Sequence, residues 1–190
     1  MNQRIRERME DSIATKRRIL ENDELLSVIE KSADAIIVCL EQNKKLVLCG
    51  NGGSASDALH FAGEIVGRFQ KERGAWPAVV LNADVATMTA IANDYGYDEV
   101  FARQAEGHVC DGDVFVGIST SGNSENVYRA LLVAKEKGAK TIALVGRDGG
   151  KIAKASDYPI IVPSDVTARI QESHIMIIHI LCEIVEERLA

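Results

Sequence analysis

Two histidines, a glutamate and a glutamine have the types and spacing that could do chemistry. His60 and Glu64 are four residues apart in a helical pattern, so they project from one helix face. His179 lies in a largely apolar helix segment, and Gln171, eight residues earlier, is turned from it by about 80°. Taken singly, a surface hydrogen bond and a core histidine are plainer explanations. Jointly, the four suit either a mixed nitrogen and oxygen site for zinc or a similar divalent ion, or an acid/base pair beside a sugar phosphate.

Two small polar turns could bind an anionic or polyhydroxylated ligand. Each follows an apolar strand pattern and precedes a helix, where unpaired backbone N–H groups and the positive end of the helix dipole favour phosphate. The first turn, 50–54, reads Gly-Asn-Gly-Gly-Ser, and Ser54 or Ser56 could cap the helix after it. The second turn, 119–124, carries four hydroxyl side chains. Because one serine would suffice as a cap, the second turn is the stronger phosphate site, and the first suits the sugar's hydroxyl end.

An alternation of strand and helix patterns must position these groups. The alternation predicts an α/β fold, a doubly wound, flavodoxin-like, five-stranded parallel sheet flanked by helices, with ligands at the carboxyl ends of the strands. We expect one domain, with residues 1–42 as an N-terminal helical extension and 43–190 as the core with its C-terminal helix. Asp23 could cap the second helix, and 93–97 reads as a polar turn. The strands are expected at 46–49, 78–81, 114–118, 141–145 and 158–162.

Composition and charge narrow the function classes. A formal net charge of -6 over 190 residues argues against a basic surface for nucleic acid or an anionic membrane. The charged amino terminus lacks the apolar core of a signal peptide, and no run approaches the roughly 18 apolar residues of a membrane span. Four cysteines without a CxxC pair indicate a reducing, cytoplasmic compartment. The last helix, about 166–189, is apolar nearly all round at 175–181, so we expect a second subunit to cover part of it.

Five segments resemble those of the phosphoheptose isomerases of the sugar isomerase (SIS) fold. They read GNGGSASDALHFAGEI, ANDYGYDEVFARQ, STSGNSENV, ALVGRDGG and TARIQESHIMIIHILCE. The resemblance runs from about residue 25 to the carboxyl end. It implies an enzyme that converts D-sedoheptulose 7-phosphate to D-glycero-D-manno-heptose 7-phosphate through an enediol, for the heptose of lipopolysaccharide core. It also implies homotetramers with active sites at subunit interfaces.

The resemblance assigns roles to individual residues. Glu64 and His179 would be the catalytic pair, and one zinc ion per subunit would be held by His60, Glu64, Gln171 and His179. The sugar-phosphate contacts implied by the family are Asn51, Gly52, Gly53, Glu64, Asn93, Asp94, Ser119, Thr120, Ser121, Ser124 and Gln171. Two alternatives stay open: a non-catalytic SIS scaffold that binds a partner of the replication-initiator type, and an isomerase of another sugar phosphate. The metal-binding quartet argues against the scaffold, which has no reason to assemble it.

Overall fold

The chain folds around a five-stranded parallel sheet with the strand order β2-β1-β3-β4-β5. The computed structural model describes residues 2–190. This strand order is that of flavodoxin-like, doubly wound folds, in which the strand order reverses next to the first strand. The predicted fold class is therefore confirmed. The strands are β1 (Leu46–Gly50), β2 (Ala78–Val80), β3 (Val114–Ser119), β4 (Lys140–Gly146) and β5 (Tyr158–Val162).

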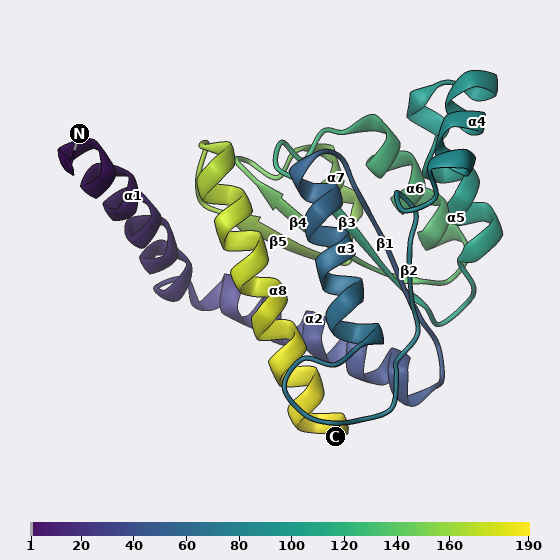
Figure 1. The fold of residues 1–190 in the computed structure, drawn as a ribbon, viewed down its shortest axis with the longest axis horizontal. Coiled ribbons are helices and arrows are strands. Elements are labelled where there is room, and N and C mark those ends of the chain that lie inside the picture. The colour runs from purple at the N-terminus through teal and green to yellow at the C-terminus, as the bar shows by residue number, and fades with distance from the viewer. Residues whose placement is uncertain (1) are drawn as a thin grey trace.

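Helices cover both faces of this sheet, as Figure 1 shows. One face packs against α2, α3 and α8, and the other against α5, α6 and α7, each through its own apolar cluster. In Figure 1, α3 and α8 lie side by side, while α1 projects away from the core. The helices are α1 (Asn2–Leu20), α2 (Asp23–Glu41), α3 (Gly53–Val66), α4 (Val85–Tyr95), α5 (Ala102–His108), α6 (Glu125–Glu136), α7 (Gly150–Ala155) and α8 (Thr167–Leu189), with a 3-10 turn η1 (Tyr97–Glu99).

The central strands are buried on both faces, which explains their unbroken apolar sequences. Leu46 and Leu48 contribute to the cluster under α2, α3 and α8, whereas Val47 and Cys49 contribute to the opposite one. In the register of β1 and β3, Gly50 is paired with Ile118. The two polar turns that follow these strands therefore leave the sheet side by side, at its carboxyl edge.

Three local predictions were wrong, and each has a physical reason. Asn22, one residue before the predicted Asp23, caps α2, because its Oδ1 accepts from the backbone N–H of Leu25 at 3.0 Å. Neither Ser54 nor Ser56 caps α3, whose N-cap is Gly52 at a φ of 56°. The predicted turn at 93–97 is also wrong at its start, because α4 continues through Tyr95 before Gly96 ends it at a φ of 93°.

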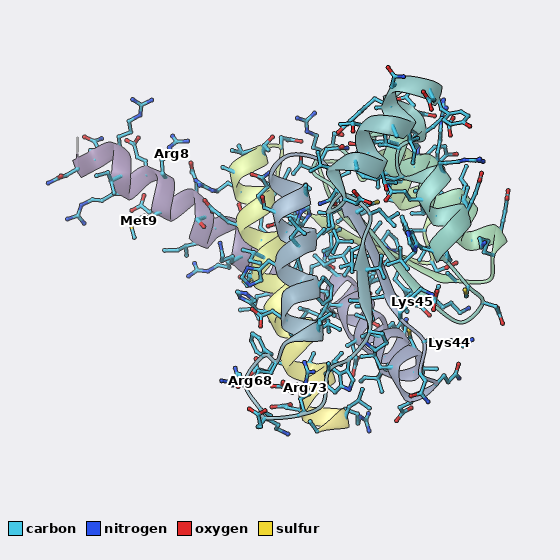
Figure 2. The ribbon with its side chains drawn as sticks, turned by 45° about the vertical axis from the view of Figure 1, so that its right-hand side comes forward. Arg8, Met9, Lys44, Lys45, Arg68 and Arg73 are labelled. Carbon is cyan, nitrogen blue, oxygen red and sulfur yellow. The ribbon has the colours of Figure 1, made fainter. Side chains whose placement is uncertain are left out.

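Exposed apolar residues mark α1 and the start of α4. Ile5, Met9 and Ile13 on α1 are each more than half exposed, and Figure 2 shows Met9 on the projecting part of this helix.

Across residues 2–190, no helix combines the length and the apolar character that a membrane crossing requires. Cys39, Cys49 and Cys182 are buried free thiols, and Cys110 is an exposed one.

Candidate active site

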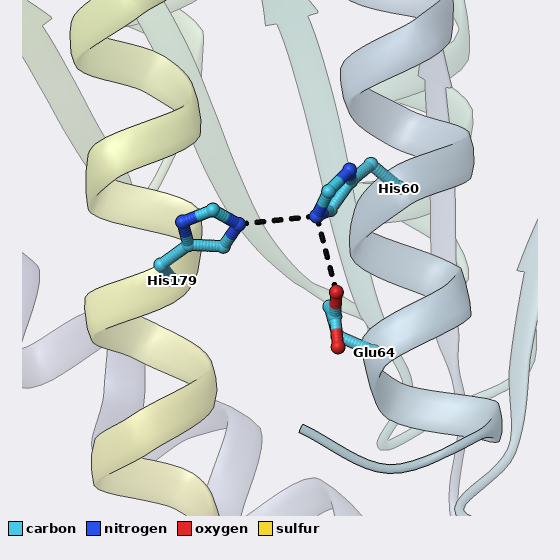
Figure 3. Close-up of side chains that lie close together, drawn as sticks. All are labelled: His60, Glu64 and His179. Carbon is cyan, nitrogen blue, oxygen red and sulfur yellow. Dashed lines mark hydrogen bonds and ion pairs between the residues drawn. The ribbon is translucent and has the colours of Figure 1, made fainter. Parts of the chain in front are cut away.

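Three of the predicted residues meet between α3 and α8. His60 Nε2 lies 3.1 Å from Glu64 Oε1 and 3.0 Å from His179 Nε2 (Figure 3). The i, i+4 spacing on α3 brings the first two together, and the packing of α8 beside α3 supplies the third. The centres of the two imidazole rings are 5.1 Å apart. The contacts among these three side chains use one oxygen of Glu64 and leave the other out (Figure 3).

This cluster has the donor set and the spacing of a metal site. One ligand atom from each of the three residues lies within 4.8 Å of the others. Two ligands of a tetrahedral zinc ion, each at about 2.1 Å from it, lie about 3.4 Å apart, so the separations of 3.0 and 3.1 Å from His60 need adjustments of only a few tenths of an ångström. The remaining pair, Glu64 and His179, lies within 4.8 Å and can close further when an ion binds. Two imidazole nitrogens at 3.0 Å also repel unless a proton or a cation lies between them. The three side chains thus fit a divalent ion.

Gln171 does not join this cluster within one chain. It lies eight residues before His179 on α8, which is about 12 Å along the helix at roughly 1.5 Å per residue. Its amide lies instead against the start of α3, where a Cβ added to Gly53 would overlap Gln171 Nε2. Gln171 therefore faces the first polar turn, and its roles as a metal ligand and a substrate contact stay predictions.

Asp57 is an acidic neighbour that the sequence reading missed. It lies one turn before His60 on α3, and its Oδ2 is buried with no hydrogen-bond partner among residues 2–190. Burial raises the pKa of this carboxyl above its usual value, and the charge of His60 acts in the opposite direction. The sequence does indicate this neighbour, because Asp57 and His60 are three residues apart and therefore lie on one face of α3.

The serine turn 119–124 forms a hydroxyl cluster. Ser119 Oγ lies 2.9 Å from Ser124 Oγ and 3.5 Å from Ser121 Oγ. Ser124 is the N-cap residue of α6, yet its side chain makes no capping bond, which leaves its hydroxyl and nearby helix N–H groups for an anion. Thr120 is half-buried in the same turn. The turn thus has the features of a phosphate site, although its substrate contacts stay predictions.

Asn126 links the two polar turns, and sequence reasoning missed it. Its side-chain amide pairs reciprocally with that of Asn51, at 2.9 and 3.1 Å, and Asn126 is only 3% exposed. Tyr97 Oη donates to Asn51 Oδ1 at 2.9 Å. Asn51 is thereby fixed at the carboxyl end of β1. The available signal for Asn126 was its position two residues after Ser124, in the STSGNSENV segment.

Asn93 and Asp94 lie apart from the other predicted contacts. Both are exposed in the last turn of α4, where Asn93 Nδ2 donates to Asp94 Oδ1 at 2.8 Å. Figure 1 places α4 well away from α3 and α8. A single chain therefore does not bring these two residues to the cluster.

His174, on α8, is a core residue. It is fully buried, and its ring nitrogen Nε2 lies 3.1 Å from the carbonyl oxygen of Val145, to which a neutral imidazole donates. Burial lowers the pKa of His174 to about 4, and the bond to Val145 opposes that shift only in part. The imidazole is therefore neutral near pH 7.

The fold and the site define a protein of the SIS class, and an SIS domain family model matches residues 9–146. The phosphoheptose isomerase of Sulfurimonas denitrificans is 50% identical over 189 residues, which are 100% of this chain and 97% of that protein. By this likeness the chain belongs to the phosphoheptose isomerase family. Two solved phosphoheptose isomerases agree: that of Neisseria gonorrhoeae has a TM-score of 0.92 at 42% identity, covering 98% of both chains. That of Francisella tularensis has a TM-score of 0.93 at 38% identity, covering 97% of both.

Proposed function

We propose that this chain is an aldose–ketose isomerase that converts D-sedoheptulose 7-phosphate to D-glycero-D-manno-heptose 7-phosphate, in heptose biosynthesis. The observation that carries the proposal is the cluster of His60, Glu64 and His179 in a chain whose full-length relatives are named phosphoheptose isomerases. The serine turn at the carboxyl edge of the sheet would hold the phosphate, with Asn51, Gly52 and Gly53 beside it. A sugar phosphate is thus the expected substrate.

Glu64 and His179 would move the two protons of the reaction. The Glu64 carboxylate takes the proton from C1 of the ketose, which leaves an enediol. The protonated Glu64 exchanges its proton with solvent and then gives a proton to C2 to form the aldose. His179 moves the hydroxyl proton from O1, which becomes the aldehyde oxygen, to O2, which becomes a hydroxyl. The atoms and charges of substrate and product therefore balance. The position of His179, 3.0 Å from His60 and on the same cluster as Glu64, supports this division of roles.

We propose zinc as the metal, one ion per subunit, because two imidazole nitrogens and a carboxylate oxygen are donors that zinc prefers. His60, His179 and Glu64 would hold it, His179 through the Nε2 that faces His60, which leaves the other ring nitrogen of His179 for proton transfer. A bound zinc ion would supply electrophilic polarisation of the substrate carbonyl. Because one carboxylate oxygen cannot be a tight ligand and a free base at once, we assign the ligand role to Glu64 Oε1, which faces His60, and the base role to Oε2.

We also propose a homotetramer with active sites at subunit interfaces. The exposed apolar side chains of α1 support it, as does a groove of about 460 Å³ between α1, α2 and α8, lined by residues such as Leu20, Leu26 and Ile180. Since one chain does not bring Gln171 to the cluster, Gln171 of a second copy is our candidate for the fourth metal ligand. The cytoplasm is the proposed compartment, which the four free cysteines support.

Turnover of purified protein tests this proposal. We expect conversion of D-sedoheptulose 7-phosphate, loss of that conversion after dialysis against a chelator, and recovery on adding zinc. Other ketose and aldose phosphates should react more slowly. A protein that binds sedoheptulose 7-phosphate but never converts it, with or without metal, would be a scaffold and would refute the proposal.

A further inference from the structure

A buried carboxylate on α8 holds the loop 67–77, which joins α3 to β2 and passes the lower end of α8 in Figure 1. Glu186 is only 2% exposed. Its oxygens accept the backbone N–H groups of Phe69, Gln70 and Lys71 at 3.1, 2.7 and 2.8 Å, and Arg73 Nε at 3.1 Å. A buried charge is costly unless donors satisfy it, and here successive backbone groups converge on it. The carboxylate therefore fixes the path of the loop.

Arg73 ties the same loop to the end of α3. Its side chain is 5% exposed, and its Nη2 and Nη1 donate to the carbonyl oxygens of Glu64 at 2.8 Å and Ile65 at 3.0 Å. Its guanidinium also lies 3.5 Å from the centre of the Trp76 ring. Figure 2 shows Arg73 beside the lower ends of α3 and α8. A cation at the carboxyl end of a helix satisfies its last carbonyl groups, one of which belongs to Glu64 itself.

The loop places an aromatic ring on the active-site histidine. The ring of Phe69 lies 5.8 Å from that of His179, tilted by 31°, and the ring of His60 lies 5.1 Å from His179. His179 therefore contacts one ring from α3 and one from the loop. The half-buried Phe69 is held there by its own backbone N–H bond to Glu186.

We infer that Glu186 and Arg73 are positioning residues for the isomerase site: through the loop 67–77 they set Phe69 against His179 and fix the backbone of Glu64. The inference rests on the proposed function. Neither residue has to touch the substrate, because both act through groups that do. A purely structural role would lower stability without changing the chemistry of the folded enzyme.

Amide hydrogen exchange tests the contact independently of turnover. In Glu186→Gln, the amides of Phe69, Gln70 and Lys71 should exchange about tenfold faster or more, and zinc affinity, measured by competition with a chromophoric chelator, should fall about tenfold. The matched control is Glu187→Gln, a neighbouring exposed glutamate on α8, which should change neither. Unchanged exchange and zinc affinity in Glu186→Gln would overturn the inference, even if the wild-type enzyme turns over.

A double-mutant cycle on the holoenzyme tests the consequence for catalysis. We expect Glu186→Gln to lower kcat about 10- to 100-fold with KM within about twofold of wild type, since small misplacements of reacting groups are costly. Phe69→Leu should lower kcat similarly, and Glu186→Gln should then add less than about a further twofold. Fully additive losses would overturn the inference. If Glu186→Gln does not fold, Arg73→Lys replaces it in the test, because lysine keeps the positive charge but loses the paired guanidinium donors. Arg73→Lys should show the same loss of kcat, and a wild-type kcat in this variant would overturn the inference.

Discussion

The contact between the serine turn and the start of α7 leads to a quantitative prediction for Gly122→Ala. Gly122 is buried at a φ of 66°, and a Cβ there would overlap the carbonyl oxygen of Gly149. The left-handed backbone costs an alanine about 1–2 kcal/mol, and overpacking against rigid backbone adds about 1–3 kcal/mol. We expect the free energy of unfolding to fall by about 2–5 kcal/mol, the sum of these two effects. Because relief of the overlap must displace the turn 119–124, KM should rise as well.

Gly112→Ala is the matched control for that prediction. Gly112 has a comparable φ of 83°, but the nearest atom to its added Cβ is Cε of the flexible Lys44 side chain at 3.3 Å. It also lies before β3, at the amino end of the sheet, far from the turn. It should lose only about 1–2 kcal/mol and keep KM. Urea unfolding and steady-state kinetics with sedoheptulose 7-phosphate measure both variants. Equal stability losses, or an unchanged KM in Gly122→Ala, would refute the reasoning.

Three further predictions concern the phosphate turn, the core histidine and the assembly. Ser124→Ala should raise KM about tenfold or more with little change in kcat, because a hydrogen bond to a charged group contributes about 1.5–3 kcal/mol; a loss confined to kcat would contradict this. Since the pKa of His174 is about 4 when folded and near 6.5 when unfolded, its contribution to stability is complete above pH 6.5 and is lost as the pH falls towards 4. Its loss should reach about 3 kcal/mol, and the difference between wild type and His174→Gln in urea unfolding across that range should report it. Ile13→Glu should reduce the oligomer size in light scattering, while Leu132→Glu, exposed on α6, should not; an unchanged mass would exclude the α1 interface.

The sheet could be predicted because its strands are buried on both faces. The runs at β1 and β3 are continuously apolar, so each strand was recognised without knowledge of its neighbours. The start of the turn at 93–97 was predicted wrongly, because Asn and Asp favour turns locally, whereas α4 keeps its helical hydrogen bonds through Tyr95. The predicted helix caps were wrong for a similar local reason. A shift of a helix start by one residue changes which side chain meets the free N–H groups at that start.

The candidate site could be predicted only where helical spacing determines it. His60 and Glu64 follow from their i, i+4 relation, and the packing of α8 beside α3 adds His179. For Gln171, the angle around α8 suggested convergence, but the rise of about 12 Å along the helix separates it from His179. Glu186 lies three residues beyond the last of the five quoted segments, and its partners are backbone groups and one arginine of a loop distant in the sequence. Such contacts leave no periodic pattern in the sequence.

Exchange of substrate hydrogen with solvent tests most directly the central claim that Glu64 moves a carbon-bound proton. In D2O, the wild-type enzyme should introduce deuterium at C2 of the heptose product, as measured by mass spectrometry or NMR. Glu64→Gln should fold, bind sedoheptulose 7-phosphate and exchange about 10²–10⁴-fold more slowly, the usual contribution of a general base. Exchange by Glu64→Gln at the wild-type rate would contradict the account.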